Sequence, residues 1–196
     1  YIINTDRSIW DALDMDRKID NLSLDINIDV SHIEKKDFDH GASRNLGVSR
    51  SCAKYFVCMT QDALPKDKYL IEELIKPMSD EIKLTYARQE AYKKASEIEK
   101  FTRSYNYPKV SVVKSEADKD SYGIKLYFCS NVCAAYERET FEKLGRFKEG
   151  LILNEDMIYA ACVLRSGKKS MYAADAVVYH SHDYSAKEQF ERNFDI

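Results

Sequence analysis

Hydrophobic and polar positions alternate along the chain with two different periods. Runs rich in β-branched and aromatic residues, typical of strands, occupy residues 1–4, 26–34, 55–60, 82–89, 127–136, 170–172 and 176–180. Apolar residues at helical spacing occupy residues 43–53, 66–78, 96–105, 138–144 and 154–165, and a last helix is expected near the end of the chain. The polar stretch 108–123 is expected to form a surface loop. This alternation predicts an α/β fold with a mostly parallel sheet flanked by helices, organised as one domain over residues 1–196.

Composition restricts the classes of ligand. The chain is 44% hydrophobic and 32% charged, as expected of a globular protein, and no apolar run approaches the roughly 20 residues that span a bilayer. The net charge of -3 provides no general attraction to nucleic acid or to an anionic membrane, so an anionic ligand needs a local site. The five cysteines are expected to be reduced, buried thiols of a cytoplasmic protein.

The first candidate site is the segment Thr60-Gln61-Asp62, which follows the apolar run 55–60. Ligands of open α/β sheets bind at the carboxyl edge of the strands, and a carboxylate there can bind a divalent cation that neutralises a diphosphate. An aspartate after a strand is also a common turn former or helix cap, and the segment alone leaves both interpretations open.

The second candidate is the segment 39–45, which places Gly41 and Ala42 at the beginning of an expected helix. Small residues allow close backbone approach, and a helix N-terminus attracts anions. Arg44 adds a bidentate phosphate donor. The alternative is an ordinary helix cap in which Arg44 forms a salt bridge.

Two further candidates lie in the second half of the chain. Glu155 and Asp156 begin an expected helix, where acids commonly complement the helix dipole, although one could instead act as a general base. His180 and His182 are alternate residues at the end of a strand, so both imidazoles could face the same cleft.

The order of these segments resembles a known family. The series HGASRN, FVCMTQDALP, YARQ, FTRSYNYP, FCSNVCAAY, LILNEDMIYAA and YAADAVVYHSHDYS is similar to second-family glycosyltransferases of the rhamnosyltransferase type, over residues 26–185. The resemblance implies a GT-A, Rossmann-like fold and a nucleotide-diphosphate sugar donor such as dTDP-rhamnose. It also implies that the sugar is transferred with inversion to a glycan or lipid-linked glycan. The expected location is the cytoplasm, at the inner face of the membrane, and no nucleic-acid partner is expected.

The resemblance also assigns roles to residues. Asp156 matches the general base, with Glu155 supporting it, and Asp62 matches the acid that binds Mg²⁺ or Mn²⁺. His180 matches a late histidine near the metal, and His182 is a weaker candidate. Arg44, Asn45 and Gln61, with Asp62, match the nucleotide-sugar pocket. Arg88, Gln89, Ser130 and Asn131 match the family's segments near the donor sugar and the acceptor.

The chain departs from the family pattern in two places. Thr60 stands where the family has the first acid of its DxD-like element, so the metal site has one carboxylate fewer. The family's first strand has no counterpart, which indicates an incomplete N-terminal end and leaves Asp6 as a substitute contact for the nucleotide. Two alternatives therefore stay open: a UDP-hexose donor, and a degenerate domain that binds nucleotide sugars without catalysis.

Overall fold

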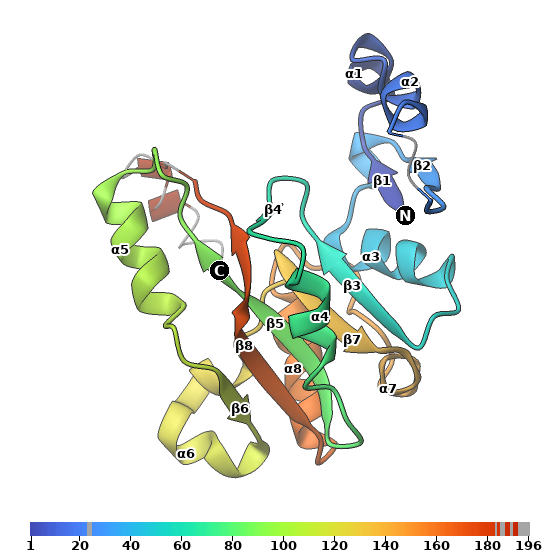
Figure 1. Ribbon diagram of the computed structural model, residues 1–196. Coiled ribbons are helices and arrows are strands. Elements are labelled where there is room, and N and C mark those ends of the chain that lie inside the picture. The colour runs from blue at the N-terminus through green and yellow to red at the C-terminus, as the bar shows by residue number, and fades with distance from the viewer. Residues whose placement is uncertain (23–24, 183, 185–186, 189, 192–196) are drawn as a thin grey trace.

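The main body of the molecule is built on one mixed β-sheet (Figure 1). The computed structural model describes residues 1–22, 25–182, 184, 187–188 and 190–191. The strand order is β3-β7-β5-β8-β4, with β6 paired to β8 beside this path. The strands are β3 (Tyr55–Met59), β4 (Leu64–Pro65), β5 (Ile82–Glu90), β6 (Val112–Lys114), β7 (Cys133–Glu137) and β8 (Lys169–Tyr179).

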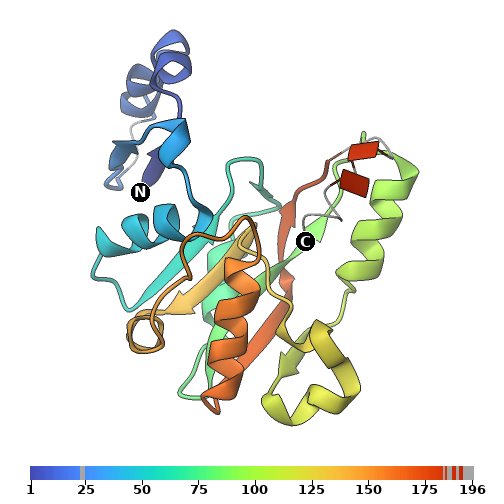
Figure 2. The same ribbon diagram turned by 180° about the vertical axis from the view of Figure 1, so that it is seen from behind.

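Helices pack around this sheet, some of them on its two faces. They are α3 (His40–Ser49), α4 (Leu70–Ile75), α5 (Glu97–Asn106), α6 (Lys119–Tyr122), α7 (Arg138–Lys143) and α8 (Glu155–Arg165). Side chains of α3, α7 and α8 join an aromatic core on one face, while α4 packs on the other through Leu70 and Leu74. Figures 1 and 2, which view the sheet from opposite sides, show α4 in front in one and α8 in front in the other.

The sequence of α8 explains why this helix is central. Tyr159, Ala160, Val163 and Leu164 recur at helical spacing, and all four are at most 1% exposed. The facing strand β7 is buried along its whole length. The helix begins at Glu155, so the packing of its apolar side fixes the position of the two acids in its first turn.

A separate two-stranded sheet forms the N-terminal part of the chain. Strands β1 (Ile2–Asn4) and β2 (Val30–His32) pair in parallel, and helices α1 (Arg7–Ala12) and α2 (Met15–Asp20) lie between them in sequence. Figure 1 shows this part projecting beyond α3 and β3. The side chain of Trp10 is buried within this N-terminal part, and its ring nitrogen donates a hydrogen bond to Asp16.

The prediction of a mostly parallel sheet is wrong. Among the described strands of the larger sheet, β5 and β8 form a parallel pair, whereas β3–β7, β5–β7, β4–β8 and β6–β8 are antiparallel. The alternation of strands and helices is confirmed, but the hydrophobic pattern of a buried strand does not specify the direction in which it is paired.

Element boundaries also differ from expectation. The stretch expected as a loop contains β6 and α6, and the two late strands merge into the single strand β8. The pairing of β5 with β8 shifts register between Ala87 and Arg88, which explains why the hydrophobic pattern appeared interrupted. The expected last helix lies partly outside the described residues.

The cysteines are less uniformly buried than expected. All five are free thiols, and Cys129 and Cys133 lie in the core. Cys52 is exposed, because it follows the end of α3 in a surface turn rather than lying within an apolar strand.

Candidate active site

The carboxylate of Asp62 and two imidazoles meet where β3 and β8 end. Nε2 of His180 lies 3.3 Å from Oδ2 of Asp62, and Nε2 of His182 lies 3.5 Å from the same oxygen. The short strand β4 pairs with the end of β8, Leu64 opposite Tyr179, and so holds the segment after β3 against the histidines. The structure therefore brings together two segments that are far apart in the sequence.

Hydrogen bonding fixes the orientation of His180. Its Nδ1 lies 2.9 Å from Oε1 of Gln89, and because an amide oxygen can only accept, Nδ1 donates and Nε2 presents a lone pair. Burial, followed by the positive charge of Arg103, lowers the pKa of His180 to about 4. The ring is neutral at neutral pH, and its lone pair faces a carboxylate.

This arrangement suits a cation. Partial burial acts to raise the pKa of Asp62, but the opposing contributions, of which the nearby Thr60 hydroxyl is the largest, outweigh it, so the pKa is lowered overall. Two electron-pair donors that face each other repel unless a positive charge lies between them. The ligand atoms of Asp62, His180 and His182 all lie within 4.8 Å of one another. A mixed set of imidazole and carboxylate fits Mn²⁺ better than Mg²⁺, which prefers oxygen ligands alone.

Gln89 connects this cluster to the next part of the site. Its Nε2 donates to Oγ of Ser130 at 3.0 Å and to the hydroxyl of Tyr107 at 2.7 Å, and its Oε1 accepts from Arg103 as well as from His180. The amide is 2% exposed at the end of β5. Because each of its hydrogen-bonding groups has a partner, its orientation is fixed, and it holds the histidine against the segment that begins at Ser130.

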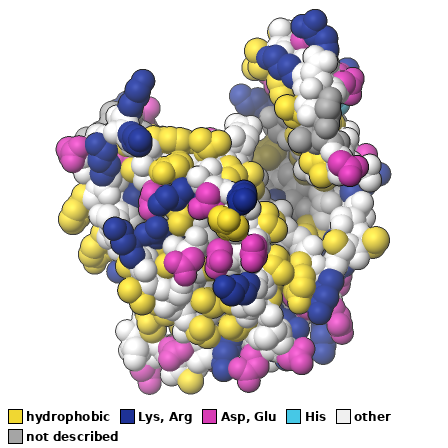
Figure 3. Space-filling view, in the orientation of Figure 1, with side chains coloured by type: hydrophobic (Ala, Val, Ile, Leu, Met, Phe, Trp, Pro, Cys, Tyr) yellow, Lys and Arg dark blue, Asp and Glu magenta, His cyan; other side chains and the backbone are white. Residues whose placement is uncertain are grey.

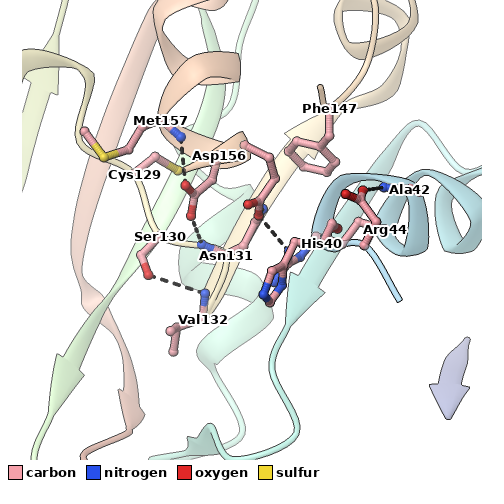
Figure 4. Close-up of polar contacts among 12 residues, drawn as sticks. His40, Ala42, Arg44, Cys129, Ser130, Asn131, Val132, Phe147, Asp156 and Met157 are labelled. Carbon is pink, nitrogen blue, oxygen red and sulfur yellow. Dashed lines mark hydrogen bonds and ion pairs between the residues drawn. The ribbon is translucent and has the colours of Figure 1, made fainter. Parts of the chain in front are cut away.

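Asp156 contacts the backbone of that segment at Asn131 (Figure 4). Its Oδ2 accepts a hydrogen bond from the backbone nitrogen of Asn131 at 2.8 Å, and its Oδ1 accepts from that of Met157 at 2.8 Å. Burial, followed by the negative charge of Glu155, raises the pKa of Asp156 to about 6. A carboxylate tuned close to neutrality is suited to accept a proton during a reaction.

Glu155 has a different environment. Its Oε1 lies 2.6 Å from Nη1 of Arg44 and accepts a hydrogen bond from Nδ2 of Asn131 at 3.0 Å. Arg44 also donates to the carbonyl of His40. The two charged side chains are 5% and 19% exposed. The salt bridge that the sequence left open for Arg44 is present, and it ties α3 to the first turn of α8.

Asn45 is directed into the protein. Its Nδ2 donates to the carbonyl of Phe147 at 3.0 Å, and its Oδ1 accepts from the backbone nitrogen of the same residue. A further hydrogen bond joins it to Glu149. These contacts hold α3 against the loop that leads to α8, and they lie beside Arg44 rather than on the hydrogen-bonded series from His180 to Asp156.

Three other residues named from the sequence also lie off this series. Arg88 forms a 2.8 Å ion pair with Glu90. Asp6 caps α1 in the N-terminal part of the chain, where it accepts from the backbone of Ile9. Gln61 is an exposed turn residue directly before Asp62.

Comparison with known proteins identifies the family of the chain. The model of glycosyl transferase family 2 matches residues 6–145, which is more than half of the chain. The chain belongs to glycosyl transferase family 2. Asp156 and His180 lie beyond the matched range, but each bonds to a residue within it, Asp156 to Asn131 and His180 to Gln89.

Two rhamnosyltransferases are similar in sequence. The O-antigen chain rhamnosyltransferase RfbN of Salmonella typhimurium is 43% identical over 171 residues, which cover 86% of this chain and 54% of the relative. WbaN of Salmonella anatum, also an O-antigen chain rhamnosyltransferase, is 36% identical over 177 residues, 89% of this chain and 56% of the relative. The chain thus spans about half the length of these relatives.

A solved structure is similar in fold. The mannosyltransferase PcManGT of Pyrobaculum calidifontis, in complex with GDP-Man and Mn2+, superimposes with a TM-score of 0.62 at 11% identity. The match covers 91% of this chain and 46% of that chain. At this identity the likeness establishes the fold, a glycosyltransferase α/β fold with a mixed sheet.

Two residues of the candidate site were not predicted from the sequence. Arg103 of α5 and Tyr107 after it both bond to Gln89. Both lie in the quoted segment FTRSYNYP, but neither was assigned a role from the sequence. The polar side of α5 reaches into the site, whereas its apolar side is exposed.

Proposed function

We propose that this chain is the catalytic part of an inverting rhamnosyltransferase, which transfers rhamnose from a nucleoside diphosphate donor, dTDP-rhamnose, to a saccharide acceptor. The 43% identity to RfbN supports the sugar and the O-antigen type of acceptor. The observation that carries the proposal is the hydrogen-bonded series that joins a cation-suited cluster, through Gln89 and the segment 130–131, to Asp156.

The cluster is assigned to the donor diphosphate. Asp62 and His180, with His182, would hold a divalent cation, Mn²⁺ or Mg²⁺, which neutralises the charge that a leaving diphosphate gains. The neutral state of His180 and the ionised state of Asp62 keep both groups ready to bind it at neutral pH. Gln89 contributes by fixing which nitrogen of His180 faces the cluster.

Asp156 is assigned to the acceptor. Its carboxylate takes the proton from the acceptor hydroxyl while the hydroxyl oxygen forms a bond to the anomeric carbon and the bond from that carbon to the diphosphate breaks. Attack on the face opposite the leaving group inverts the anomeric configuration. The two backbone hydrogen bonds from Asn131 and Met157 hold the carboxylate in one orientation before the substrate arrives.

Glu155 and Arg44 are assigned a supporting role in the same site. Their ion pair lies between α3 and α8, and Glu155 also binds the amide of Asn131, whose backbone contacts Asp156. The negative charge of Glu155 contributes to the raised pKa of Asp156, while Arg44 offsets part of it. The acceptor is proposed to be a glycan carried on lipid at the cytoplasmic face of the membrane.

Donor binding provides the test. In the presence of Mn²⁺, dTDP-rhamnose should raise the melting temperature of the chain more than UDP-glucose does at equal concentration, because a ligand stabilises the state that binds it. The same comparison with Asp62→Asn should show a much smaller rise. A larger rise with UDP-glucose would assign a hexose donor. No rise with either nucleotide sugar would favour a domain that has lost the reaction.

A further inference from the structure

Helix α5 presents an apolar face to solvent. Ile98, Phe101 and Tyr105 are 80%, 70% and 66% exposed, and they lie three and four residues apart on one side of the helix. The rings of Phe101 and Tyr105 stack with centroids 6.2 Å apart. This set of three side chains, called here the α5 face, is an unusual feature because an amphipathic helix normally buries its apolar side.

The opposite side of α5 is already occupied. Arg103 bonds there to Glu99 and to Gln89, so the helix cannot rotate to bury its apolar side without breaking the site. Two further apolar side chains are exposed: Val110, four residues after the end of α5, at 70%, and Ile124, which precedes the Lys125 that lies over the ring of Tyr105, at 73%. The exposure of Ile98, Phe101 and Tyr105 therefore follows from the contacts of Arg103, and an exposed apolar patch of this kind is typical of a binding surface.

The charges around the α5 face are mostly positive. The segment 93–109 contains the basic residues Lys93, Lys94, Lys100, Arg103 and Lys109 and the acidic residues Glu97 and Glu99. Both acids are paired, Glu97 with Lys100 and Glu99 with Arg103. Lys125 adds a further cation above the ring of Tyr105. Figure 3 shows basic and hydrophobic side chains together on the side of the molecule that α5 occupies.

We propose that the α5 face and its surrounding lysines form a docking surface for an anionic phospholipid membrane. Aliphatic and aromatic side chains of an interfacial helix enter the boundary between headgroups and acyl chains, and flanking lysines attract anionic headgroups. Protein–protein interfaces are depleted in lysine, so a lysine border favours lipid over a protein partner. No helix within the described ranges is long and apolar enough to cross a bilayer, and this surface binds at its edge.

Docking through α5 also orients the site. Arg103 on the inner side of the helix bonds to Gln89, which bonds to His180, so the cation-suited cluster lies behind α5 as seen from the membrane. A helix is about 10 Å thick, which brings lipid-carried substrates close to the cluster. This consequence rests on the proposed function, whereas docking itself does not.

Vesicle flotation tests the docking surface without any sugar substrate. The chain should float with phosphatidylcholine vesicles that contain phosphatidylglycerol, bind pure phosphatidylcholine at least about tenfold more weakly, and lose binding as salt is raised. The double variant Ile98→Ser with Phe101→Ser should bind the anionic vesicles about tenfold or more weakly. The matched control Ile26→Ser with Ile71→Ser, at positions 64% and 51% exposed elsewhere on the surface, should bind like the parent.

A second pair of variants tests the charge. Lys93→Gln with Lys94→Gln should weaken binding several-fold at low salt, whereas the exposed pair Lys35→Gln with Lys36→Gln should not. Ile98→Trp should strengthen binding, which provides a result that does not depend on losing a side chain.

Three results would overturn the docking surface. The first is no flotation of the parent with anionic vesicles at low salt. The second is an equal loss in the control pair Ile26→Ser with Ile71→Ser. The third is absence of vesicle binding together with concentration-dependent self-association, measured by sedimentation, that Phe101→Ser abolishes. A second copy of the chain would then cover the α5 face. A failure of sugar transfer would leave flotation unchanged, so the two proposals fail separately.

Discussion

Replacing Asp156 by asparagine should stabilise the folded chain while it removes turnover. The carboxylate is partly buried next to Glu155, and these surroundings raise its pKa from 3.8 to about 6. The folded chain therefore binds a proton at this position more tightly than the unfolded chain does. At neutral pH the group is ionised in both states, and its ionisation costs the folded state free energy.

The size of this cost follows from the pKa. A shift of about two pKa units corresponds to about 3 kcal/mol. The asparagine amide has only one oxygen to accept from the backbone nitrogens of Asn131 and Met157, so one of these hydrogen bonds is weakened. This weakening offsets about 1 kcal/mol of the stability that the replacement gains. The variant should therefore be more stable than the parent by about 1–2 kcal/mol above pH 6. The difference should shrink as the pH falls below about 6 and disappear only below 3.8, where the carboxyl becomes protonated in both states.

Urea denaturation at a series of pH values measures this difference directly. The same proteins should be compared in a transfer assay, where the variant should lose about a hundredfold or more in kcat and keep nearly the parental affinity for the donor. Asp118→Asn is a suitable control, because the pKa of Asp118 is lowered by hydrogen bonds from Ser115 and its loss should cost stability at neutral pH. A variant of Asp156 that is less stable at pH 8, or whose stability difference does not change with pH, would refute the reasoning.

Three further predictions test the surroundings of the site. The kcat/KM of the parent should rise with pH through about 6 as Asp156 ionises, and a flat profile between about pH 5 and 7 in a transfer assay would exclude it as the base. Gln89→Leu should weaken Mn²⁺ binding, measured by titration, about 10–100-fold because His180 loses its orienting partner, whereas unchanged affinity would leave Gln89 without that role. Arg44→Met should cost about 3 kcal/mol of stability in urea denaturation because it leaves Glu155 buried and unpaired. Adding Glu155→Gln should recover much of the loss, and equal losses in the single and double variants would show that the pairing is unimportant.

The residues that carry the chemistry could be predicted from local signals only together with a resemblance. Asp62 and His180 both follow apolar strands, which left structural interpretations open. The resemblance to second-family glycosyltransferases implied that both lie near one metal, and the structure places them 3.3 Å apart. The apolar side of α8 likewise predicts a helix that begins at Glu155 and places Asp156 in its first turn. These features depend on short stretches of sequence whose periodicity is strong.

Other features depend on contacts that no local pattern records. The direction of pairing in the sheet is set by where each strand returns, and the hydrophobic residues of β7 do not show whether its neighbours run parallel or antiparallel to it. The role of Arg103 depends on the orientation of α5, whose polar side bonds to Gln89 while its apolar side is exposed, and the period of a helix does not show which side faces a site. The close approach of Gly41 to the carbonyl of Lys148, where an added Cβ would lie 2.2 Å from the oxygen, is equally invisible without coordinates.

The central claim is that Asp62 and Asp156 serve one reaction in two different ways. The most direct test compares three proteins, the parent, Asp62→Asn and Asp156→Asn. For each, Mn²⁺ binding is measured with and without dTDP-rhamnose, and rhamnosyl transfer is measured in parallel. The account predicts that Asp62→Asn loses both donor-dependent Mn²⁺ binding and transfer, whereas Asp156→Asn keeps the first and loses the second. Full transfer by Asp156→Asn, or parental Mn²⁺ binding by Asp62→Asn, would contradict it.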